Sequence, residues 1–203
     1  MKYEAASLRT KRALAESLKK LMRRKALSKI TVTEIVADCG VNRKTFYYHF
    51  EDIYDLLRWI FEEEAVKIIH GYYDVDEPEE AIGFTLDYVS ENLAMLKNAY
   101  DAFGSVELEN FFLSSLNGLT RQVVEKGERR MGKRLPESLK DYLCEFLTEA
   151  TSGMLLSYIS GTFPFDRQKT IAFVSLIVRT AIKGLLDEQG IPEDSAAILP
   201  EQN

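Results

Sequence analysis

Hydrophobic residues recur every three or four positions through most of this 203-residue chain. This spacing is typical of amphipathic helices, which complete a turn in about 3.6 residues, whereas half-buried strands alternate at every second residue. The five prolines fall between the periodic segments rather than inside them, at positions 78, 136, 164, 192 and 200. The pattern therefore predicts an all-α protein.

Two helices are predicted at the start of the chain. The first covers about residues 7–24. The second begins after Thr31, because Thr31 and Glu34 have the spacing of a capping box, in which each side chain bonds the backbone amide of the other residue. It ends at Gly40, which can adopt the left-handed conformation that a tight turn requires.

A third, shorter helix is predicted over about residues 43–49, with Asn42 as its N-cap. Phe46 and Phe50 are four residues apart and share one face, which we expect to point into the core. At about 100° per residue, the other side chains point outward or to the flanks. That surface contains Arg43, Lys44, Thr45, Tyr47, Tyr48 and His49.

The rest of the chain continues as helices after a turn-rich acidic segment, residues 71–80. Further helices are predicted at about 52–70, 79–100, 105–131, 136–160 and 166–188. From Gly190 onward the sequence is short and broken by two prolines, so we expect it to be frayed. The predicted division is an N-terminal helix-turn-helix domain at 1–52, a helical ligand or partner-binding and dimerisation domain at 53–190, and a flexible tail at 191–203.

Charge is divided unevenly along the chain, although its net value is only −6. Residues 1–50 carry twelve Lys and Arg against four Asp and Glu, a net charge of +8. Residues 51–203 carry 14 against 28, a net charge of −14. A basic segment attached to an acidic remainder predicts a polyanionic partner for the first segment alone.

A helix, a glycine-containing turn and a second short helix form the helix-turn-helix arrangement that reads the major groove of DNA. The outward side chains of the third helix suit that task. Lysine can reach guanine or a phosphate, threonine can donate to a phosphate or contact a thymine methyl group, and tyrosine hydroxyls bind the backbone. We therefore predict that residues 31–50 bind double-stranded DNA.

The run TVTEIVADCGVNRKTFYYHFEDIYDLL, residues 31–57, resembles the DNA-binding signature of TetR-family transcription regulators. In that signature a threonine-capped helix is followed, at these spacings, by the residues that stand here as Gly40, Val41, Asn42, Thr45, Phe46, Tyr47, His49 and Phe50. The resemblance, over about residues 8–60, implies a helical DNA-binding domain followed by a helical effector and dimerisation domain. It also implies that DNA is contacted by Thr33, Asn42, Arg43, Lys44, Thr45, Tyr47, Tyr48 and His49.

Two positions depart from that signature. Lys44 stands where the family often has a small residue, which predicts an additional long side chain at a base. Ile53, behind Glu51 and Asp52, stands where the family commonly has a lysine that contacts a phosphate. We expect DNA affinity to depend more on the cations of the first helix, or to be modest.

The last two predicted helices are rich in apolar residues. By the same resemblance they pair with their counterparts in a second copy, over about residues 136–160 and 166–188, as a four-helix bundle. A homodimer places two recognition helices about 34 Å apart, as a pseudo-palindromic operator requires. Internal core is the alternative explanation for these apolar residues.

We expect DNA affinity to be controlled by a small effector or a partner protein that binds the acidic remainder of the chain. An effector pocket could be lined by Phe84, Tyr88, Phe103, Phe111, Phe112 and Met154. A purely structural role in the core is the alternative for these residues. The segments FFLSSLNGL and GMLLSYISGTFPF look like the subgroup that contains the activator of dihydroxyacetone kinase operons, which implies a partner protein and activation instead of repression. A helical protein-interaction adaptor is a further alternative, but it leaves the basic segment without a role.

Catalytic and metal-binding patterns are missing from the sequence. Its two histidines, His49 and His70, have no His or Cys at metal-ligand spacing, and no glycine-rich phosphate loop occurs. We therefore predict a protein that is not an enzyme and that needs no cofactor and no metal. Its apolar stretches are too short to cross a membrane, and its first twenty residues are too charged for a secretory signal. A cytoplasmic protein with two free, buried thiols, Cys39 and Cys144, is expected.

Overall fold

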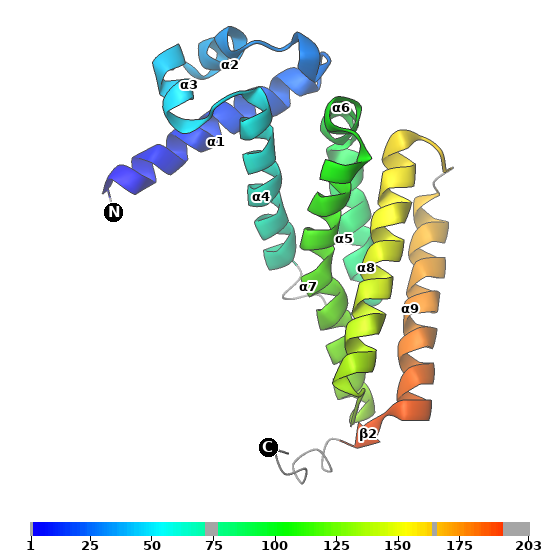
Figure 1. The fold of residues 1–203 in the computed structure, drawn as a ribbon. Helices are drawn as coiled ribbons and strands as arrows, with labels where there is room; N and C mark the ends of the chain where they lie inside the picture. Colours follow the sequence, from blue (N-terminus) through cyan, green and yellow to red (C-terminus); the bar gives the residue numbers. More distant parts are fainter. Residues whose placement is uncertain (1, 72–76, 164–165, 193–203) are drawn as a thin grey trace.

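The computed structural model describes residues 2–71, 77–163 and 166–192 (Figure 1). Residues 2–50, which we call the head, contain α1 (Lys2–Met22), a 3₁₀ turn η1 (Leu27–Lys29), α2 (Val32–Cys39) and α3 (Arg43–His49). The long helix α4 (Ile53–Gly71) leads away from the head. These helices agree closely with the predicted ranges, except that α1 begins at Lys2 rather than near residue 7.

Residues 77–192, which we call the body, contain α5 (Pro78–Glu91), α6 (Leu93–Phe103), α7 (Ser105–Met131), α8 (Glu137–Ser160) and α9 (Arg167–Gln189). α7 lies at the centre: α4 and α8 pack along it, and α9 packs against α5 and α7 (Figure 1). The head and the edge formed by α9 are therefore separated by the width of the body.

One predicted helix is divided in two. The pattern predicts a single helix over about 79–100, but the chain leaves helical geometry at Asn92, where φ is −106° and ψ is 11°. The Asn92 side-chain amide donates to the Tyr88 carbonyl (2.9 Å), which also accepts the Asn92 backbone amide (3.1 Å) at the end of α5. An asparagine rather than a glycine or proline makes this break, which explains why the pattern does not reveal it.

The all-α fold is confirmed, with one small exception among the described residues. β1 (Lys133–Arg134) pairs antiparallel with β2 (Ile191–Pro192), with Lys133 opposite Pro192 and Arg134 opposite Ile191. The prediction of a frayed end from Gly190 is therefore wrong for the first residues of that segment. Residues 193–203 of the predicted tail, and 72–76 of the predicted linker, lie outside the described residues.

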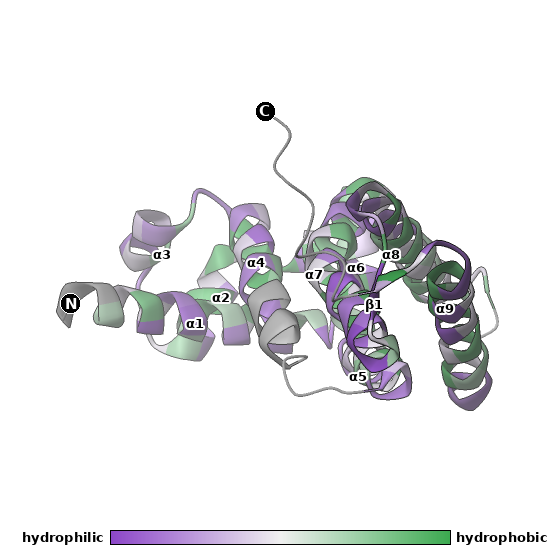
Figure 2. Cartoon of the chain, turned by 90° about the horizontal axis from the view of Figure 1, so that it is seen from below, coloured by the Kyte–Doolittle hydropathy of each residue, from purple (hydrophilic) through white to green (hydrophobic). Residues whose placement is uncertain are grey.

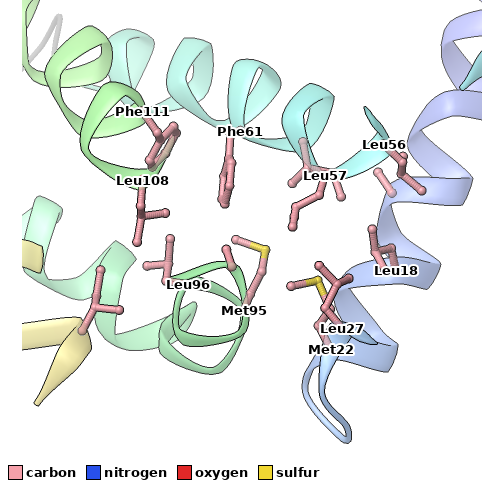
Figure 3. Packing of buried hydrophobic residues seen from close by; sticks show 14 of the residues in the cluster. Leu18, Met22, Leu27, Leu56, Leu57, Phe61, Met95, Leu96, Leu108 and Phe111 are labelled. Carbon is pink, nitrogen blue, oxygen red and sulfur yellow. The ribbon is translucent and has the colours of Figure 1, made fainter. Parts of the chain in front are cut away.

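A single hydrophobic core extends from the head into the body. Figure 3 shows buried side chains from α1, α4, α6 and α7 facing one common space, among them Leu18, Met22, Leu57, Phe61, Met95, Leu96, Leu108 and Phe111. Because side chains in such a core are close-packed, a shift of α6 is transmitted to α1 and α4.

A second, smaller core joins α7, α8 and α9 at the end of the body remote from the head. Cys144 is buried within it, whereas Cys39 on α2 is only half-buried, which corrects the expectation that both thiols are buried. Both cysteines are free.

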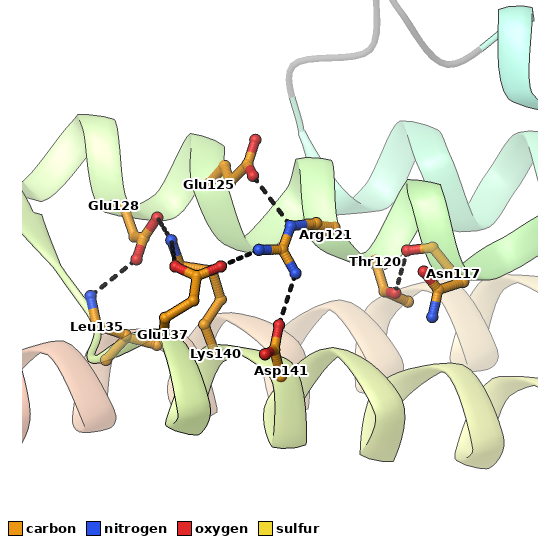
Figure 4. Close-up of polar contacts among 9 residues, drawn as sticks. All are labelled: Asn117, Thr120, Arg121, Glu125, Glu128, Leu135, Glu137, Lys140 and Asp141. Atoms are coloured by element: carbon orange, nitrogen blue, oxygen red, sulfur yellow. Dashed lines mark hydrogen bonds and ion pairs between the residues drawn. The ribbon is translucent and has the colours of Figure 1, made fainter. Parts of the chain in front are cut away.

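A polar cluster accompanies this smaller core (Figure 4). The buried Lys140 ammonium lies 3.1 Å from Glu128, whose other oxygen accepts the Leu135 amide at 2.8 Å. Arg121 on α7 binds Asp141 (2.8 Å) and Glu137, both on α8. These contacts fix the register of α8 along α7.

Candidate DNA-binding site

The cap of α2 has the predicted reciprocal form. The Glu34 amide donates to Thr31 Oγ1 (3.3 Å), and the Thr31 amide donates to Glu34 Oε2 (2.9 Å). Lys25 adds an ion pair to the Glu34 carboxylate. The lysine, followed by the bonds from Thr31, lowers the pKa of Glu34 to about 2. α2 is therefore held at its start by a carboxylate that stays ionised at physiological pH.

The turn between α2 and α3 is also the predicted one. Gly40 has φ 71° and ψ 26°, a left-handed conformation that glycine adopts without a clash of a side chain. Asn42 then caps α3: its Oδ1 accepts the Thr45 amide (2.9 Å) and the Thr45 hydroxyl (3.1 Å). The Asn42 amide group carries donors that suit a phosphate.

Aromatic rings hold α3 from its inner side. Phe46 is fully buried and Phe50 nearly so, with 6.0 Å between their ring centres. Phe50 lies 5.8 Å from Trp59 of α4, and the Lys11 ammonium of α1 lies 5.3 Å from the centre of the Phe50 ring. This cation–π contact joins α1, α3 and α4, and no spacing in the sequence indicates it.

The opposite side of α3 is exposed. Tyr48 exposes 68% of its surface and Tyr47 52%, and both Arg43 and Lys44 are exposed. His49 is half-buried beside Tyr48, with 4.9 Å between ring centres. Burial, assisted by the nearby Lys11 charge, lowers the pKa of His49, so the imidazole is neutral at pH 7. A neutral imidazole can donate one hydrogen bond and accept another.

The structure brings the eight predicted DNA-contacting residues to neighbouring elements. Seven lie on α3 or at its cap, and Thr33 is exposed in the first turn of α2, which packs against α3. Thr45 is half-buried, and its hydroxyl and amide both donate to Asn42. Their individual contacts with DNA stay a prediction.

Several cations of the head are engaged within the protein, which the net charge of +8 does not indicate. Two of these ion pairs attach α1 to α4, one attaches α1 to α2, and one joins the α1–η1 turn to α2. The pairs are Arg12 with Glu63, Lys19 with Glu64, Lys20 with Asp38 and Lys25 with Glu34. The first helix therefore offers DNA fewer cations than its composition suggests.

Asn98 on α6 connects the body to the head, and no pattern in the sequence singles it out. Its amide donates to the Met22 carbonyl (2.7 Å) and to the Lys25 carbonyl (3.4 Å), while its oxygen accepts the Leu27 amide (3.1 Å). The partners lie 71 to 76 residues away in sequence, beyond the reach of any local pattern.

The body contains two cavities that adjoin each other. The first, of about 60 Å³, is lined by α5, α7, α8 and α9, and the second, of about 200 Å³, mainly by α5, α7 and α9; both are partly open to solvent. Of the six residues predicted to line an effector pocket, Met154 lies in the wall of the first cavity.

The other five of these residues have different surroundings. Phe84 exposes 41% of its surface, and Phe111 and Phe112 are buried in the main core with their rings 5.1 Å apart. Tyr88 and Phe103 are half-buried against that core, and Phe103 contacts Tyr54 with 5.3 Å between ring centres. Burial raises the pKa of Tyr88 above its ordinary value.

Family comparisons agree with this architecture. A family model described as "Bacterial regulatory proteins, tetR family" matches residues 11–60, which contain α2, the turn and α3. A second, described as "Transcriptional regulator C-terminal region", matches residues 76–180, more than half of the chain. The chain belongs to the TetR family. It is a DNA-binding transcriptional regulator with a helix-turn-helix, as the resemblance of residues 31–57 implies.

Individual proteins resemble this chain in sequence or in fold. The chain is 26% identical over 140 residues to the HTH-type dhaKLM operon transcriptional activator DhaS of Lactococcus lactis subsp. lactis, a match that covers 69% of this chain and 74% of DhaS. A solved structure of the dihydroxyacetone kinase operon activator DhaS has a TM-score of 0.73 at 24% identity, covering 87% of this chain and 97% of that one. The structure of RolR in complex with resorcinol has a TM-score of 0.51 at 17% identity, covering 98% of each chain.

Membership of the TetR family points to a regulator rather than to an enzyme. Among the residues that the structure describes, His, Cys, Asp and Glu side chains form no group of three or more that could hold a metal ion. Within the same ranges, every helix is too short or too polar to cross a membrane.

Proposed function

We propose that this TetR-family regulator acts in the cytoplasm as a homodimer bound to a pseudo-palindromic operator. The observation that carries the proposal is an exposed apolar face on α8 and α9. Figure 2 shows these two helices at the edge of the body remote from α1 and α4. Five large side chains there expose 60% to 79% of their surface. They are Tyr142, Phe146, Phe173, Leu176 and Ile177.

The spacing of these residues places them in one exposed apolar stripe along each helix. Tyr142 and Phe146 are four residues apart on α8, and Phe173, Leu176 and Ile177 are three and four apart on α9, so each set shares one side of its helix. A two-fold axis lets the same stripes meet in a second copy, as a four-helix bundle. Each side chain buried in this way contributes about 1.5–3 kcal/mol, which favours the dimer over exposed monomers.

Two linked heads suit an operator of two half-sites. Recognition helices about 34 Å apart reach successive major grooves on one side of the duplex. A ligand or partner protein that binds the body and favours another separation of the heads lowers DNA affinity. The core shared by α1, α4 and α6, together with the Asn98 bonds, supports this coupling.

The dimer is tested by light scattering of the full chain at micromolar concentration. We expect about twice the 23.2 kDa chain mass for the unaltered protein and the monomer mass for Phe146→Glu and Ile177→Glu. Phe84→Glu, which places the same charge on an exposed aromatic of α5, is the matched control and stays dimeric. A monomeric unaltered chain contradicts the proposal, as does a monomeric variant that binds the operator with full affinity.

Activation together with a partner protein is a second candidate function. The observation that favours it is the name of the Lactococcus relative, a transcriptional activator, combined with a match over 140 residues. A reporter fused to the operator-bearing promoter distinguishes the two directions. Loss of the regulator lowers reporter expression if the chain activates and raises it if the chain represses.

A further inference from the structure

The two cavities of the body share part of their walls. Pro78 and Ala81 of α5, and Leu119 and Val123 of α7, line both. A ligand with two chemically different ends can therefore place one end in each cavity. The character of each wall indicates what those ends are.

The first cavity is apolar. Leu86, Leu116, Leu147, Leu155 and Val178 contribute to its wall. Two of its threonines turn their hydroxyls to their own helices: Thr85 donates to the Ala81 carbonyl and Thr120 to the Asn117 carbonyl, both at 2.9 Å. At about 60 Å³ the space is less than half of the roughly 150 Å³ that accommodates a benzene ring. A slender aliphatic chain fits it better than an aromatic ring does.

The second cavity has a cationic wall. Among the described residues, its charged lining consists of four cations and the carboxylate of Glu77; the cations are Lys126, Arg130, Arg179 and Lys183. These are four of only 14 basic residues in the acidic segment 51–203. Glu79 pairs with Arg179 from outside the wall, so within the described ranges the four cations face two glutamates.

The contacts of Glu77 show which chemical group this wall accepts. Both Glu77 oxygens receive bonds from the Arg130 guanidinium, at 2.8 and 3.1 Å, and Arg179 lies 3.7 Å from one of them. A guanidinium binds a carboxylate or a phosphate in this bidentate way, whereas an alcohol offers it no matching pair of oxygens.

The proposed dimer face borders this wall. Around α9, Arg179 lies about 60° from Leu176 of the exposed stripe, and Lys183 lies about 20° from it.

We propose that the two cavities together bind a small amphipathic anion, with its aliphatic chain in the apolar cavity and its carboxylate or phosphate among Lys126, Arg130, Arg179 and Lys183. The claim that this ligand is the effector rests on the proposed function, whereas the claim that it binds to these cavities does not. The site connects α5 to α7 and α9, and α5 also packs on α6, the helix that carries Asn98.

Titration calorimetry of the full chain tests the site with hexanoate, hexyl phosphate, hexan-1-ol and hexylammonium. We expect the two anions to bind at least about tenfold more tightly than the alcohol or the amine. The stronger of the two anions identifies the head group. Affinity also rises along the series acetate, butanoate and hexanoate, because each added methylene enters the apolar cavity. Equal binding of hexan-1-ol, or no rise along the series, overturns the proposal.

Substitutions locate the binding. Lys126→Gln combined with Lys183→Gln is expected to weaken binding of the better anion about tenfold or more, whereas Lys169→Gln, an exposed lysine of α9 outside both walls, leaves it unchanged. Equal loss in both proteins overturns the assignment of the head group. A gel shift that measures operator binding without ligand tests the proposed function separately. If the anion binds but leaves operator affinity unaltered, the effector role is rejected and the binding site is still supported.

Discussion

Lys44 and Tyr48 lie on the side of α3 that faces away from the core. Each is two residues from the buried Phe46, and therefore about 200° around the helix from it. Once residues 43–49 are known to be helical, these directions follow from the helical period, so this part of the site can be predicted from sequence. The half-burial of His49 and the contact of Lys11 with Phe50 could not, because both depend on how α1 crosses α3 and α4.

Replacing Lys44 with alanine is expected to relax the sequence preference at one base pair and to weaken operator binding by about 1–3 kcal/mol. The physical reason is the loss of a long donor at a base edge. Gel shifts with operators varied one base pair at a time measure both effects. Full affinity and full specificity in Lys44→Ala and Tyr48→Ala together would exclude α3 as the recognition helix.

Acid is expected to weaken the α2 cap through Glu34. Its pKa in the folded chain, about 2, lies below the ordinary 4.5, so the ionised carboxylate stabilises the fold above pH 4.5. This contribution is lost as the pH falls from 4.5 towards 2. Thermal unfolding followed by circular dichroism across that window should show a steeper fall for the unaltered chain than for Glu34→Gln, which cannot titrate. Parallel curves for the two proteins would contradict the role of this carboxylate.

At the scale of elements, α6 is the part of the fold that the pattern conceals. Its periodic residues continue those of α5, and the two helices are separated only at Asn92, whose backbone leaves helical geometry. Separated from α5, α6 presents Asn98 to the end of α1 and to η1. Residues that line an effector pocket are difficult to predict for a related reason, because large apolar side chains are as suitable for a core as for a pocket. Only tertiary packing places Met154 in a cavity wall and Phe111 in the main core.

Asn98→Ala is expected to lower the free energy of unfolding by about 1–3 kcal/mol, because it leaves backbone groups of Met22 and Leu27 without their partner. It should also weaken operator binding, since the orientation of the head is less fixed. Denaturant unfolding and gel shifts measure the two effects. Asn110→Ala, at an exposed position on α7, is the control and should change neither. If the Asn98→Ala protein is less stable but binds the operator with unaltered affinity, the role of Asn98 is purely structural.

For the whole molecule, the distribution of charge matters more than its net value. The head carries an excess of cations, but four of them form ion pairs within the protein that connect α1, α2 and α4. The acidic remainder of the chain repels the phosphates and limits DNA contact to the head. The charge division was evident from the sequence, whereas the internal use of these cations required the fold.

The salt dependence of operator binding separates the two kinds of cation. Arg43 is exposed at the start of α3, so Arg43→Ala should lower the slope of log affinity against log salt by about 0.9 if it contacts a phosphate. Lys20 is held by Asp38, so Lys20→Ala should change the slope much less. Equal changes of the slope for the two variants would mean that the ion pairs of the head break when the protein binds DNA.

The bonds of Asn98 have a consequence for how such regulators diversify. All three of its partners are backbone groups, of Met22, Lys25 and Leu27. The three hydrogen bonds therefore do not depend on which side chains stand in that turn, and only Met22 and Leu27 are also constrained by the main core. Substitutions at the exposed positions between them can accumulate without detaching the head, so the link to the body can be inherited while the surface of the turn changes.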